Sequence, residues 1–324
     1  MFSPRMSADG SIETIMTTAF ISHQDCSLHN MGPEHPESPI RLHAIRRVLE
    51  RTGLIEQLIQ FEAPHVTSEQ ITRVHAELHQ KRLEMKLPEE GVVYADEDTA
   101  LCPDSLHAAS LAAGGAVLAT EKVLSGEVDN AFVAVRPPGH HAEYKAAMGF
   151  CFYNNVAVAA AHALEQEGIE RVAILDFDVH HCNGTVDIFQ NRPDVLVCST
   201  FQHPYYPERY TEIDRPNIIN CPLKAHGPAS EWREAVIERW MPALEQHKPD
   251  MIFISAGFDA HREDPMADLN LEEEDYAWVT ERILEVAERF SKGRVVSVLE
   301  GGYNPVALAF CVLTHLEVLA ASNS

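Results

Sequence analysis

The sequence lacks the features that mark membrane, secreted or disulfide-stabilised proteins. No apolar run approaches the roughly eighteen residues of a membrane-spanning helix, and the amino terminus has no basic flank followed by an apolar core. The seven cysteines are odd in number, dispersed and without a C-x-x-C pair, which is typical of a reducing compartment. We therefore expect a cytoplasmic protein without a membrane span, a signal peptide or a disulfide framework.

Positive charge is also scarce. Lys and Arg number 25 against 49 Asp and Glu, and the formal net charge is −24. A nucleic-acid-binding surface needs clustered Lys and Arg to neutralise phosphates, so this composition argues against such a partner. The acidity would attract a cationic substrate, although solubility alone explains it equally well. The composition leaves the oligomeric state open.

The 324 residues suit one large α/β domain. Residues 1–16 show little periodicity and are expected to form a flexible extension, with a single domain over 17–324. Strand-like and helix-like patterns alternate, which predicts a mostly parallel sheet covered by helices on both faces. The expected strands are 20–22, 130–135, 171–177, 194–200, 217–221, 251–255 and 294–299; the expected helices include 40–51, 104–124, 156–166, 230–246 and 272–290.

Polar residues lie at or shortly after the ends of four of the predicted strands. His140 and His141 come after 130–135, Asp178 and His180 end the run that starts at Arg171, Asp259 follows 251–255, and Tyr303 follows 294–299. The carboxyl ends of parallel strands meet at one edge of a sheet, where ligands bind. The sequence therefore predicts one pocket that these side chains share.

Three of these residues form a candidate metal site. Asp178 and His180 are one residue apart, so on a strand their side chains point the same way. With Asp259 they supply one imidazole and two carboxylates, the open three-ligand set of catalytic zinc. A lone Asp-x-His is more often structural than metal-binding, and only the surrounding motifs reverse that judgement.

Five motifs in collinear order resemble the zinc-dependent histone deacetylase family, whose bacterial members include acetylpolyamine amidohydrolases. The resemblance runs from about His35 to Leu308. Its motifs are Arg136-Pro-Pro-Gly-His-His141, Met148-Gly-Phe-Cys-Phe-Tyr-Asn-Asn155, Asp176-Phe-Asp-Val-His-His-Cys-Asn-Gly184, Ala256-Gly-Phe-Asp-Ala-His261 and Leu299-Glu-Gly-Gly-Tyr303.

The resemblance implies a single-domain arginase–deacetylase fold, with a mostly parallel eight-stranded sheet between helices. It implies that Asp178, His180 and Asp259 hold zinc and that Tyr303 donates to the developing oxyanion. His141 would be the general base and His140 its electrostatic partner, oriented by Asn183 and Asp176 respectively. Without the resemblance, Tyr303 would read as a packed core residue after a glycine turn.

The resemblance also implies substrate-binding positions. Phe150 and Tyr206 match two aromatic walls of a narrow tunnel for an acetyl-lysine side chain, and Gly149 leaves space between them. Met266 matches a rim position that is glutamate in some polyamine-selective relatives. Two further positions match less closely: Asp98, which matches a rim aspartate or is a solvated acidic loop residue, and Arg41, which matches an internal-channel arginine or starts a surface helix.

A structural potassium ion is implied near the zinc, held by Asp176, by the carbonyls of Asp178, His180 and Thr200, and by the Ser199 hydroxyl. Hard oxygen ligands suit such an ion. Phe189 and Val195 would lend carbonyls to a second ion.

Two departures from the family pattern stand out. Cys182 replaces a usual glycine, so either the backbone there needs no positive φ or the thiol fits a small void; a redox role is the alternative. Glu208-Arg-Tyr210 replaces a common Gly-Thr-Gly at the rim, which leaves substrate choice open.

The sequence predicts a zinc-dependent amidohydrolase that removes acyl groups from acetyl-lysine, with acetylpolyamines or other small acylated amines as alternatives and the native metal, zinc or iron, undecided. A binuclear, arginase-like hydrolase would need carboxylates where Cys182 and His261 stand. A catalytically silent module that binds acylated ligands would lack Tyr303, His141 or a metal ligand, and none is missing.

Overall fold

The computed structural model describes residues 5–6, 12–13 and 17–321. The expected extension over 1–16 therefore lies largely outside the described residues, apart from the short antiparallel pair of β1 (Arg5–Met6) and β2 (Ile12–Glu13). No described helix is long and apolar enough to cross a membrane.

An eight-stranded sheet forms the centre of the molecule, and every neighbouring pair in it is parallel. This confirms the predicted fold class. The central strands are fully buried, which explains why they read as continuous apolar runs. In sheet order they are β10 (Ile218–Leu223), β9 (Val195–Gln202), β8 (Val172–Asp176), β11 (Met251–Ala256), β12 (Val295–Leu299), β7 (Asn130–Ala134), β3 (Thr18–Ser22) and β4 (Ile59–Glu62).

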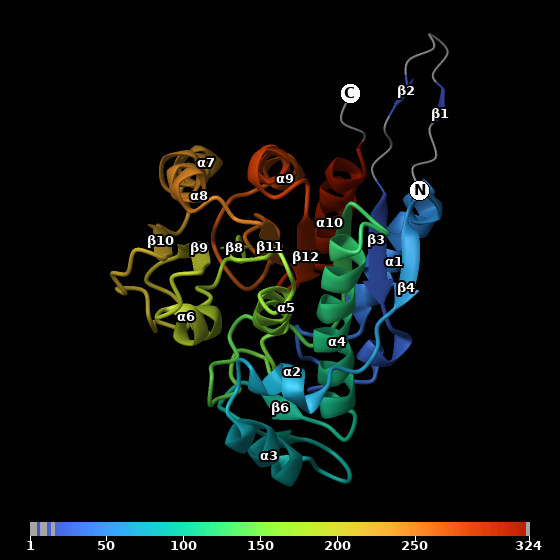
Figure 1. Cartoon of the computed structure of the whole chain (residues 1–324). Helices are drawn as coiled ribbons and strands as arrows, with labels where there is room; N and C mark the ends of the chain where they lie inside the picture. Colours follow the sequence, from blue (N-terminus) through green and yellow to red (C-terminus); the bar gives the residue numbers. More distant parts are fainter. Residues whose placement is uncertain (1–4, 7–11, 14–16, 322–324) are drawn as a thin grey trace.

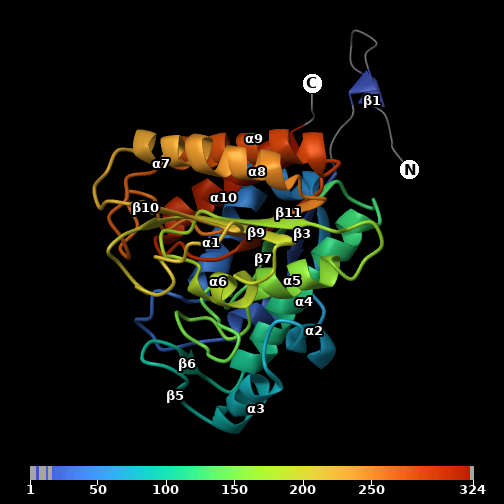
Figure 2. The ribbon, with the colours of Figure 1, turned by 60° about the vertical axis from the view of Figure 1, so that its left-hand side comes forward.

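Helices cover both faces of this sheet, as Figures 1 and 2 show. One face carries α4 (Ser105–Leu124), α5 (Asn155–Ala163) and α6 (Asn183–Phe189). The other carries α1 (Ile40–Thr52), α10 (Pro305–Ala320), α9 (Glu273–Phe290), α7 (Ala229–Ala235), the π-helical turn η3 (Val236–Trp240) and α8 (Met241–His247). The smaller elements are η1 (Gln24–Ser27), η2 (Leu54–Gln57), α2 (Ser68–Thr72), α3 (Glu77–Lys86) and the pair β5 (Val93–Tyr94) and β6 (Ala100–Leu101).

Several observed elements were not among the predicted ones: β4, α10 and the shorter α2, α3, α6, β5 and β6. β4 was not expected, because this edge strand is only four residues long and its side chains are mostly exposed, although Ile-Gln-Phe-Glu alternates apolar and polar residues. α10 was not expected either, because it is apolar on most of its surface and packs against both α1 and α9. The helix predicted over 230–246 corresponds to α7, η3 and α8, which follow one another without a gap; the middle turn, η3, is π-helical.

The strand order brings the four motif-bearing strands together. β8, β11, β12 and β7 are consecutive neighbours in the sheet. From β8 the chain proceeds outward to β9 and β10, then returns to β11 on the opposite side of β8. Such a reversal of strand order opens a crevice at the carboxyl ends of the strands.

Candidate active site

Asp178, His180 and Asp259 meet in this crevice between β8 and β11. Their ligand atoms all lie within 4.8 Å of one another, and all three residues are buried. His180 Nδ1 is 3.0 Å from Asp178 Oδ1 and 3.1 Å from Asp259 Oδ2. Within the described part of the chain, this is the one cluster of three or more such side chains able to hold a metal ion.

Backbone groups and glycines fix the two carboxylates. The Val179 N–H donates to Asp259 Oδ1 at 2.8 Å, and the Gly301 N–H donates to Asp178 Oδ2 at 2.8 Å. A Cβ at Gly301 would lie 2.1 Å from Asp259 Oδ2, so no larger residue fits there. The loops that follow β8 and β12 thus hold the two carboxylates in place.

The electrostatics of this triad favour a bound positive charge. Burial lowers the pKa of His180, but hydrogen bonds to Asp178 and Asp259 outweigh it and raise the pKa to about 10. Burial and the adjacent Asp178 carboxylate raise the pKa of Asp259 to about 7. The two carboxylates thus draw a proton onto the imidazole between them, and a divalent cation on the same three atoms would replace it. The donor set therefore fits a metal ion.

His140 and His141 lie beside the triad with their ring centroids 4.0 Å apart. His140 Nδ1 is 2.9 Å from Asp176 Oδ2, and the other oxygen of that carboxylate accepts the Asp178 N–H at 3.0 Å. Burial lowers the pKa of His140, but the carboxylates of Asp178 and Asp176 outweigh it and raise the pKa well above its usual value. These contacts favour the cationic form of His140.

His141 has the opposite surroundings. Its Nδ1 is 2.7 Å from the amide oxygen of Asn183, and that oxygen can only accept a hydrogen bond. Burial, together with His140 and His180, lowers the pKa of His141 well below its usual value. The contacts therefore favour a neutral imidazole with its proton on Nδ1 and a lone pair on Nε2.

Tyr303 stands on a turn at the carboxyl end of β12. Gly302 before it has a φ of 121°, which disfavours any residue with a side chain. The Tyr303 N–H donates to Asp264 Oδ2 at 2.6 Å, and the guanidinium of Arg41 lies 5.0 Å from the ring centroid. Burial raises the pKa of Tyr303 well above its usual value, so the phenol keeps its proton.

The overall sequence and fold match known proteins. Residues 35–319 match the protein family described as the histone deacetylase domain. The chain belongs to the histone deacetylase family. It is 36% identical to a histone deacetylase-like amidohydrolase of Pseudomonas aeruginosa, over 95% of this chain and 87% of the relative. It is 38% identical to a probable deacetylase of Archaeoglobus fulgidus, over 94% and 86% of the two chains. The solved HDA15 HD domain superposes with a TM-score of 0.87 at 31% identity, covering 94% of this chain and 90% of that one.

In this histone deacetylase family member, the two expected tunnel residues lie beside the site. The Phe150 ring centroid is 6.0 Å from that of Tyr303, and the Tyr206 centroid is 5.2 Å from that of His141. A Cβ on Gly149, whose φ is 56°, would lie 2.3 Å from His141 Cδ2. Asp98 accepts the Gly149 N–H at 3.0 Å, so it holds this loop rather than lying free in solvent.

The rim of the site contains one residue that the sequence analysis missed. The Tyr205 ring stacks on His180, with centroids 5.7 Å apart and planes 24° apart. Its hydroxyl donates to the backbone carbonyl of Met266 at 2.5 Å, so Met266, half-buried, contacts the site through its main chain. The sequence signal was available, because Tyr205 directly precedes the predicted wall residue Tyr206.

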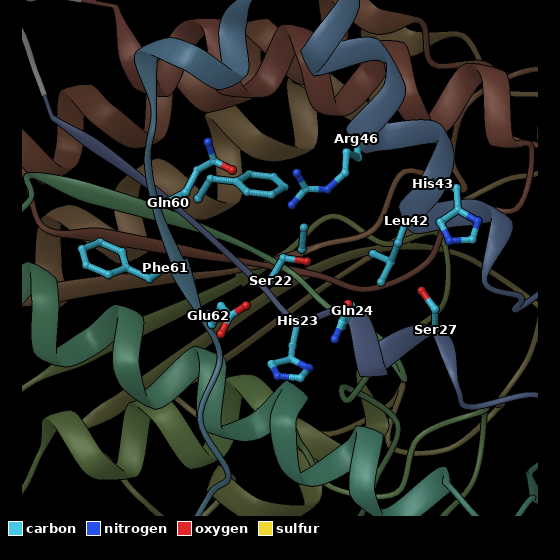
Figure 3. A pocket seen from close by; sticks show the side chains of 12 residues that line it. Ser22, His23, Gln24, Ser27, Leu42, His43, Arg46, Gln60, Phe61 and Glu62 are labelled. Atoms are coloured by element: carbon cyan, nitrogen blue, oxygen red, sulfur yellow. The ribbon is translucent and has the colours of Figure 1, made fainter.

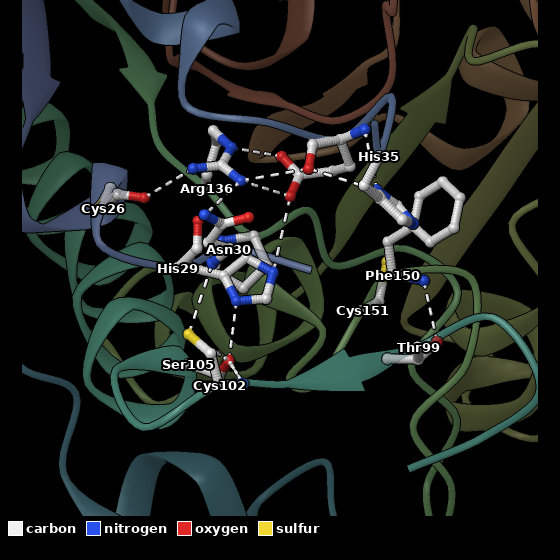
Figure 4. A network of polar contacts seen from close by, with 12 residues as sticks. Cys26, His29, Asn30, His35, Thr99, Cys102, Ser105, Arg136, Phe150 and Cys151 are labelled. Carbon is white, nitrogen blue, oxygen red and sulfur yellow. Dashed lines mark hydrogen bonds and ion pairs between the residues drawn. The ribbon is translucent and has the colours of Figure 1, made fainter. Parts of the chain in front are cut away.

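Arg41 lies in the first turn of α1 but is fully buried, so it is not a surface residue at the start of a helix. Its Nη1 lies 3.1 Å from Glu37 Oε1, and its Nε donates to the Gly302 carbonyl. Glu37 also accepts from Arg136, at 2.6 Å through Nη2, and lies 3.6 Å from His29 Nε2. Figure 4 shows Arg136 and His29 in this network, which extends to Ser105. Only the position of Glu37 in a proline-rich loop could have drawn attention to it in the sequence.

Three of the residues expected around potassium lie on the neighbouring strands β8 and β9. Asp176 and Ser199 are register partners on β8 and β9, and Thr200 follows. Ser199 Oγ is buried and has no hydrogen-bond partner, so it is available as an oxygen ligand. The carbonyls of Phe189 and Val195, implied for a second ion, both accept from Asn217 Nδ2, at 2.9 and 3.0 Å.

The structure shows how Cys182 replaces the usual glycine and where the His261 side chain points. Cys182 has a φ of −77°, so its backbone does not require glycine, and its side chain is fully buried in the core. Burial raises the pKa of the Cys182 thiol well above its usual value, which opposes a redox role. The His261 ring turns away from the triad, with Nε2 3.5 Å from Glu273. Neither side chain supplies the additional carboxylate that a binuclear site needs.

A separate cavity of about 530 Å³ lies at the carboxyl ends of β3 and β7. Figure 3 shows Ser22, Leu42, Arg46 and Glu62 among the residues that line it. None of the candidate catalytic residues lines this cavity. Its charged side chains are of both signs, so the lining favours no particular class of ligand.

Proposed function

We propose that this chain is a zinc-dependent amidohydrolase that removes acetyl groups from acetylated lysine side chains, and that residues 17–324 form its single catalytic domain in the cytoplasm. The observation that carries the proposal is the juxtaposition of the Asp178–His180–Asp259 triad with two imidazoles of opposite pKa direction. A binding module needs no such separation of an acid from a base.

A divalent cation held by Asp178, His180 and Asp259 supplies Lewis acidity, which lowers the pKa of a water molecule and polarises a carbonyl oxygen. His141 Nε2 accepts the proton of the attacking water and returns it to the leaving amine. Asn183 keeps the other ring proton on Nδ1 throughout. His140, paired with Asp176, holds positive charge beside the site where negative charge develops.

Tyr303 completes the set as a hydrogen-bond donor to the carbonyl oxygen under attack. Its raised pKa keeps the phenol protonated at neutral pH, and the glycine turn with Arg41 fixes its ring. Phe150 and Tyr206 flank the substrate's methylene chain. A preorganised donor of this kind is worth about a hundredfold or more in turnover.

We also propose a structural potassium ion at Asp176, Ser199, Thr200 and the carbonyls of Asp178 and His180. The unpartnered Ser199 hydroxyl supports it. Potassium there would order the β8 loop that carries two zinc ligands. Hard oxygen donors suit such an ion.

Acetylpolyamines are the second candidate substrate class, favoured by the net charge of −24. The uncharged Met266 at the rim favours acetyl-lysine instead.

Turnover of an acetyl-lysine peptide should be compared with turnover of acetylputrescine and acetylspermidine, using zinc-loaded and chelator-stripped protein. Peptide turnover that is lost on stripping and restored by zinc supports the lysine deacetylase. Turnover of the polyamines alone supports the second class, and inactivity on every substrate rejects both.

A further inference from the structure

We propose that Glu143 and Arg209 are positioning residues that act on His141 through Asn183. This inference rests on the proposed function, because it concerns the base of that reaction. Glu143 follows His141 by two positions, and Arg209 lies in the loop between β9 and β10 where the chain departs from the family pattern. Three side-chain contacts connect Arg209 at the rim to the ring of His141.

The contacts are short and mostly shielded from water. Arg209 Nη2 lies 3.0 Å from Glu143 Oε2, and Asn183 Nδ2 donates to Glu143 Oε1 at 2.8 Å. Asn183 Oδ1 is in turn 2.7 Å from His141 Nδ1. Asn183 is fully buried and Glu143 is 5% exposed, whereas the Arg209 side chain is 49% exposed. The chain of contacts therefore leads from solvent to the base.

Asn183 alone does not determine the tautomer of His141. An amide can present either its oxygen or its NH2 group to a neighbouring ring, and the surrounding hydrogen bonds decide which. The Glu143 carboxylate accepts only, so it holds the NH2 group and leaves the oxygen for the ring. The opposite orientation would set the amide oxygen against the carboxylate. Met148 Sδ and the His141 carbonyl also accept from this NH2 group, at 3.2 and 3.4 Å, but the Glu143 carboxylate is the nearest acceptor and the only charged one. Glu143 thereby favours the proton of His141 on Nδ1 and the lone pair on Nε2.

Glu143 also restores the negative charge that the neutral Asn183 lacks. A carboxylate in direct contact would stabilise the imidazolium that forms when His141 takes a proton. Here the carboxylate lies one residue further away, and the polarised amide between them transmits part of its effect. Burial raises the pKa of the Glu143 carboxyl, and the hydrogen bond from Asn183 and the charge of Arg209 oppose that rise.

The rim loop is built to hold Arg209 in this position. Glu208 and Tyr210, on either side, have φ values of 53° and 60°, a backbone conformation that residues with side chains rarely adopt. The Tyr210 hydroxyl lies 2.8 Å from Asp187 Oδ1 on α6, which fixes the loop against the helix that begins at Asn183. The Glu208-Arg-Tyr210 departure thus serves the base rather than only the outer rim.

The variants Glu143→Met, Glu143→Gln and Arg209→Met test the inference on the metal-loaded full chain. Glu143→Met should lower kcat on an acetyl-lysine peptide by about tenfold or more, with little change in KM, because the base is misoriented. Glu143→Gln should recover most of that loss, since its amide oxygen still accepts from Asn183. Arg209→Met should show a smaller decrease, and Arg289→Met, which removes a surface pair with Glu245 on distant helices, should show none. Wild-type kcat in Glu143→Met would overturn the inference.

A second comparison does not depend on the stability of one variant. In Asn183→Asp, two carboxylates would face each other at the distance now bridged by a hydrogen bond, so turnover should fall. Adding Glu143→Gln to that variant should raise turnover again. Equal or lower turnover of the double variant would overturn the inference.

Nitrogen NMR of the histidine rings separates this inference from the proposed function. The Nδ1–H tautomer of His141 should be present in the wild type and in Glu143→Gln, and depleted in Glu143→Met. An unchanged tautomer in Glu143→Met would overturn the positioning role. If the wild type turned over no acylated amine, the proposed function would fail, while the ring signals would still decide the role of Glu143.

Discussion

Arg41 donates through Nε to the carbonyl oxygen of Gly302 at 2.7 Å, across 261 positions of the chain. A second guanidinium nitrogen donates to the carbonyl of Glu300, and the same group lies under the Tyr303 ring. The buried guanidinium therefore holds two carbonyls of the turn that precedes the phenol. The position of Tyr303 depends on a helix from the other end of the sequence.

Replacing Tyr303 with Phe should lower turnover of an acetyl-lysine peptide by about a hundredfold or more, because one oxyanion donor is lost. The ring packing against Phe150 is preserved, so zinc content and melting temperature should stay at wild-type values. Steady-state kinetics with metal analysis checks both. Turnover near that of the wild type would remove Tyr303 from the reaction.

Replacing Asp259 with Asn should reduce the zinc bound per chain, because only the Asp178 carboxylate and the His180 imidazole would remain as strong ligands. Elemental analysis after dialysis measures this. His261→Ala is the matched control: it lies in the same motif but faces Glu273, so it should retain zinc. Zinc loss in the control with retention in Asp259→Asn would reject the assigned ligand set.

Gly149→Ala should impair activity more than stability. Its added Cβ would lie 2.3 Å from His141 Cδ2, which forces the base out of place. Gly168→Ala is the control, because Gly168 also has a positive φ, 83°, but has open space around it. Both variants should lose a similar amount of stability from backbone strain, about 1 kcal/mol. Only Gly149→Ala should lose kcat, and equal kinetics in the two would contradict the collision.

Glu37→Gln should destabilise the fold by about 3–5 kcal/mol at neutral pH, because Arg41 and Arg136 would be left buried without their carboxylate. Burial raises the pKa of Glu37, but Arg136 and Arg41 outweigh it and lower the pKa from 4.5 to about 2. A lowered folded-state pKa means that this stabilisation is present above pH 4.5 and is lost as the pH falls towards 2.

The difference between Glu37→Gln and wild type should therefore shrink as denaturant unfolding is repeated from pH 7 downward. The exposed pair of Arg46 and Glu50 provides the control, since its atoms are 3.7 Å apart and about half exposed. Glu50→Gln should change stability by less than about 1 kcal/mol at every pH. A constant difference for Glu37→Gln would show that its charge is not what stabilises the network.

Potassium should raise the melting temperature relative to an equal concentration of a larger organic cation, because only the folded state holds the site. Ser199→Ala removes one proposed ligand and its unpartnered hydroxyl. That variant should lose most of the potassium dependence while keeping the fold. Thermal scans in the two salts decide it, and an undiminished shift in Ser199→Ala would place the ion elsewhere.

The sequence by itself determined where the chemistry lies. Each buried strand reads as an apolar run, and parallel strands align their carboxyl ends, so the residues after those runs had to converge. The contacts of His140 with Asp176 and of His141 with Asn183 were expected from motif positions and are present. The residue pattern did not predict β4, whose side chains are mostly exposed, or α10, which is buried on most sides.

Only the tertiary structure decided what supports these residues. Three supporting contacts join distant segments: Arg41 with Gly302, Ser199 with Asp176, and Glu143 with Arg209. Their side-chain directions depend on strand register and on packing between elements, neither of which leaves a periodic trace in the sequence. Even Glu143, two positions from His141, turns to Asn183 only because α6 begins against that loop.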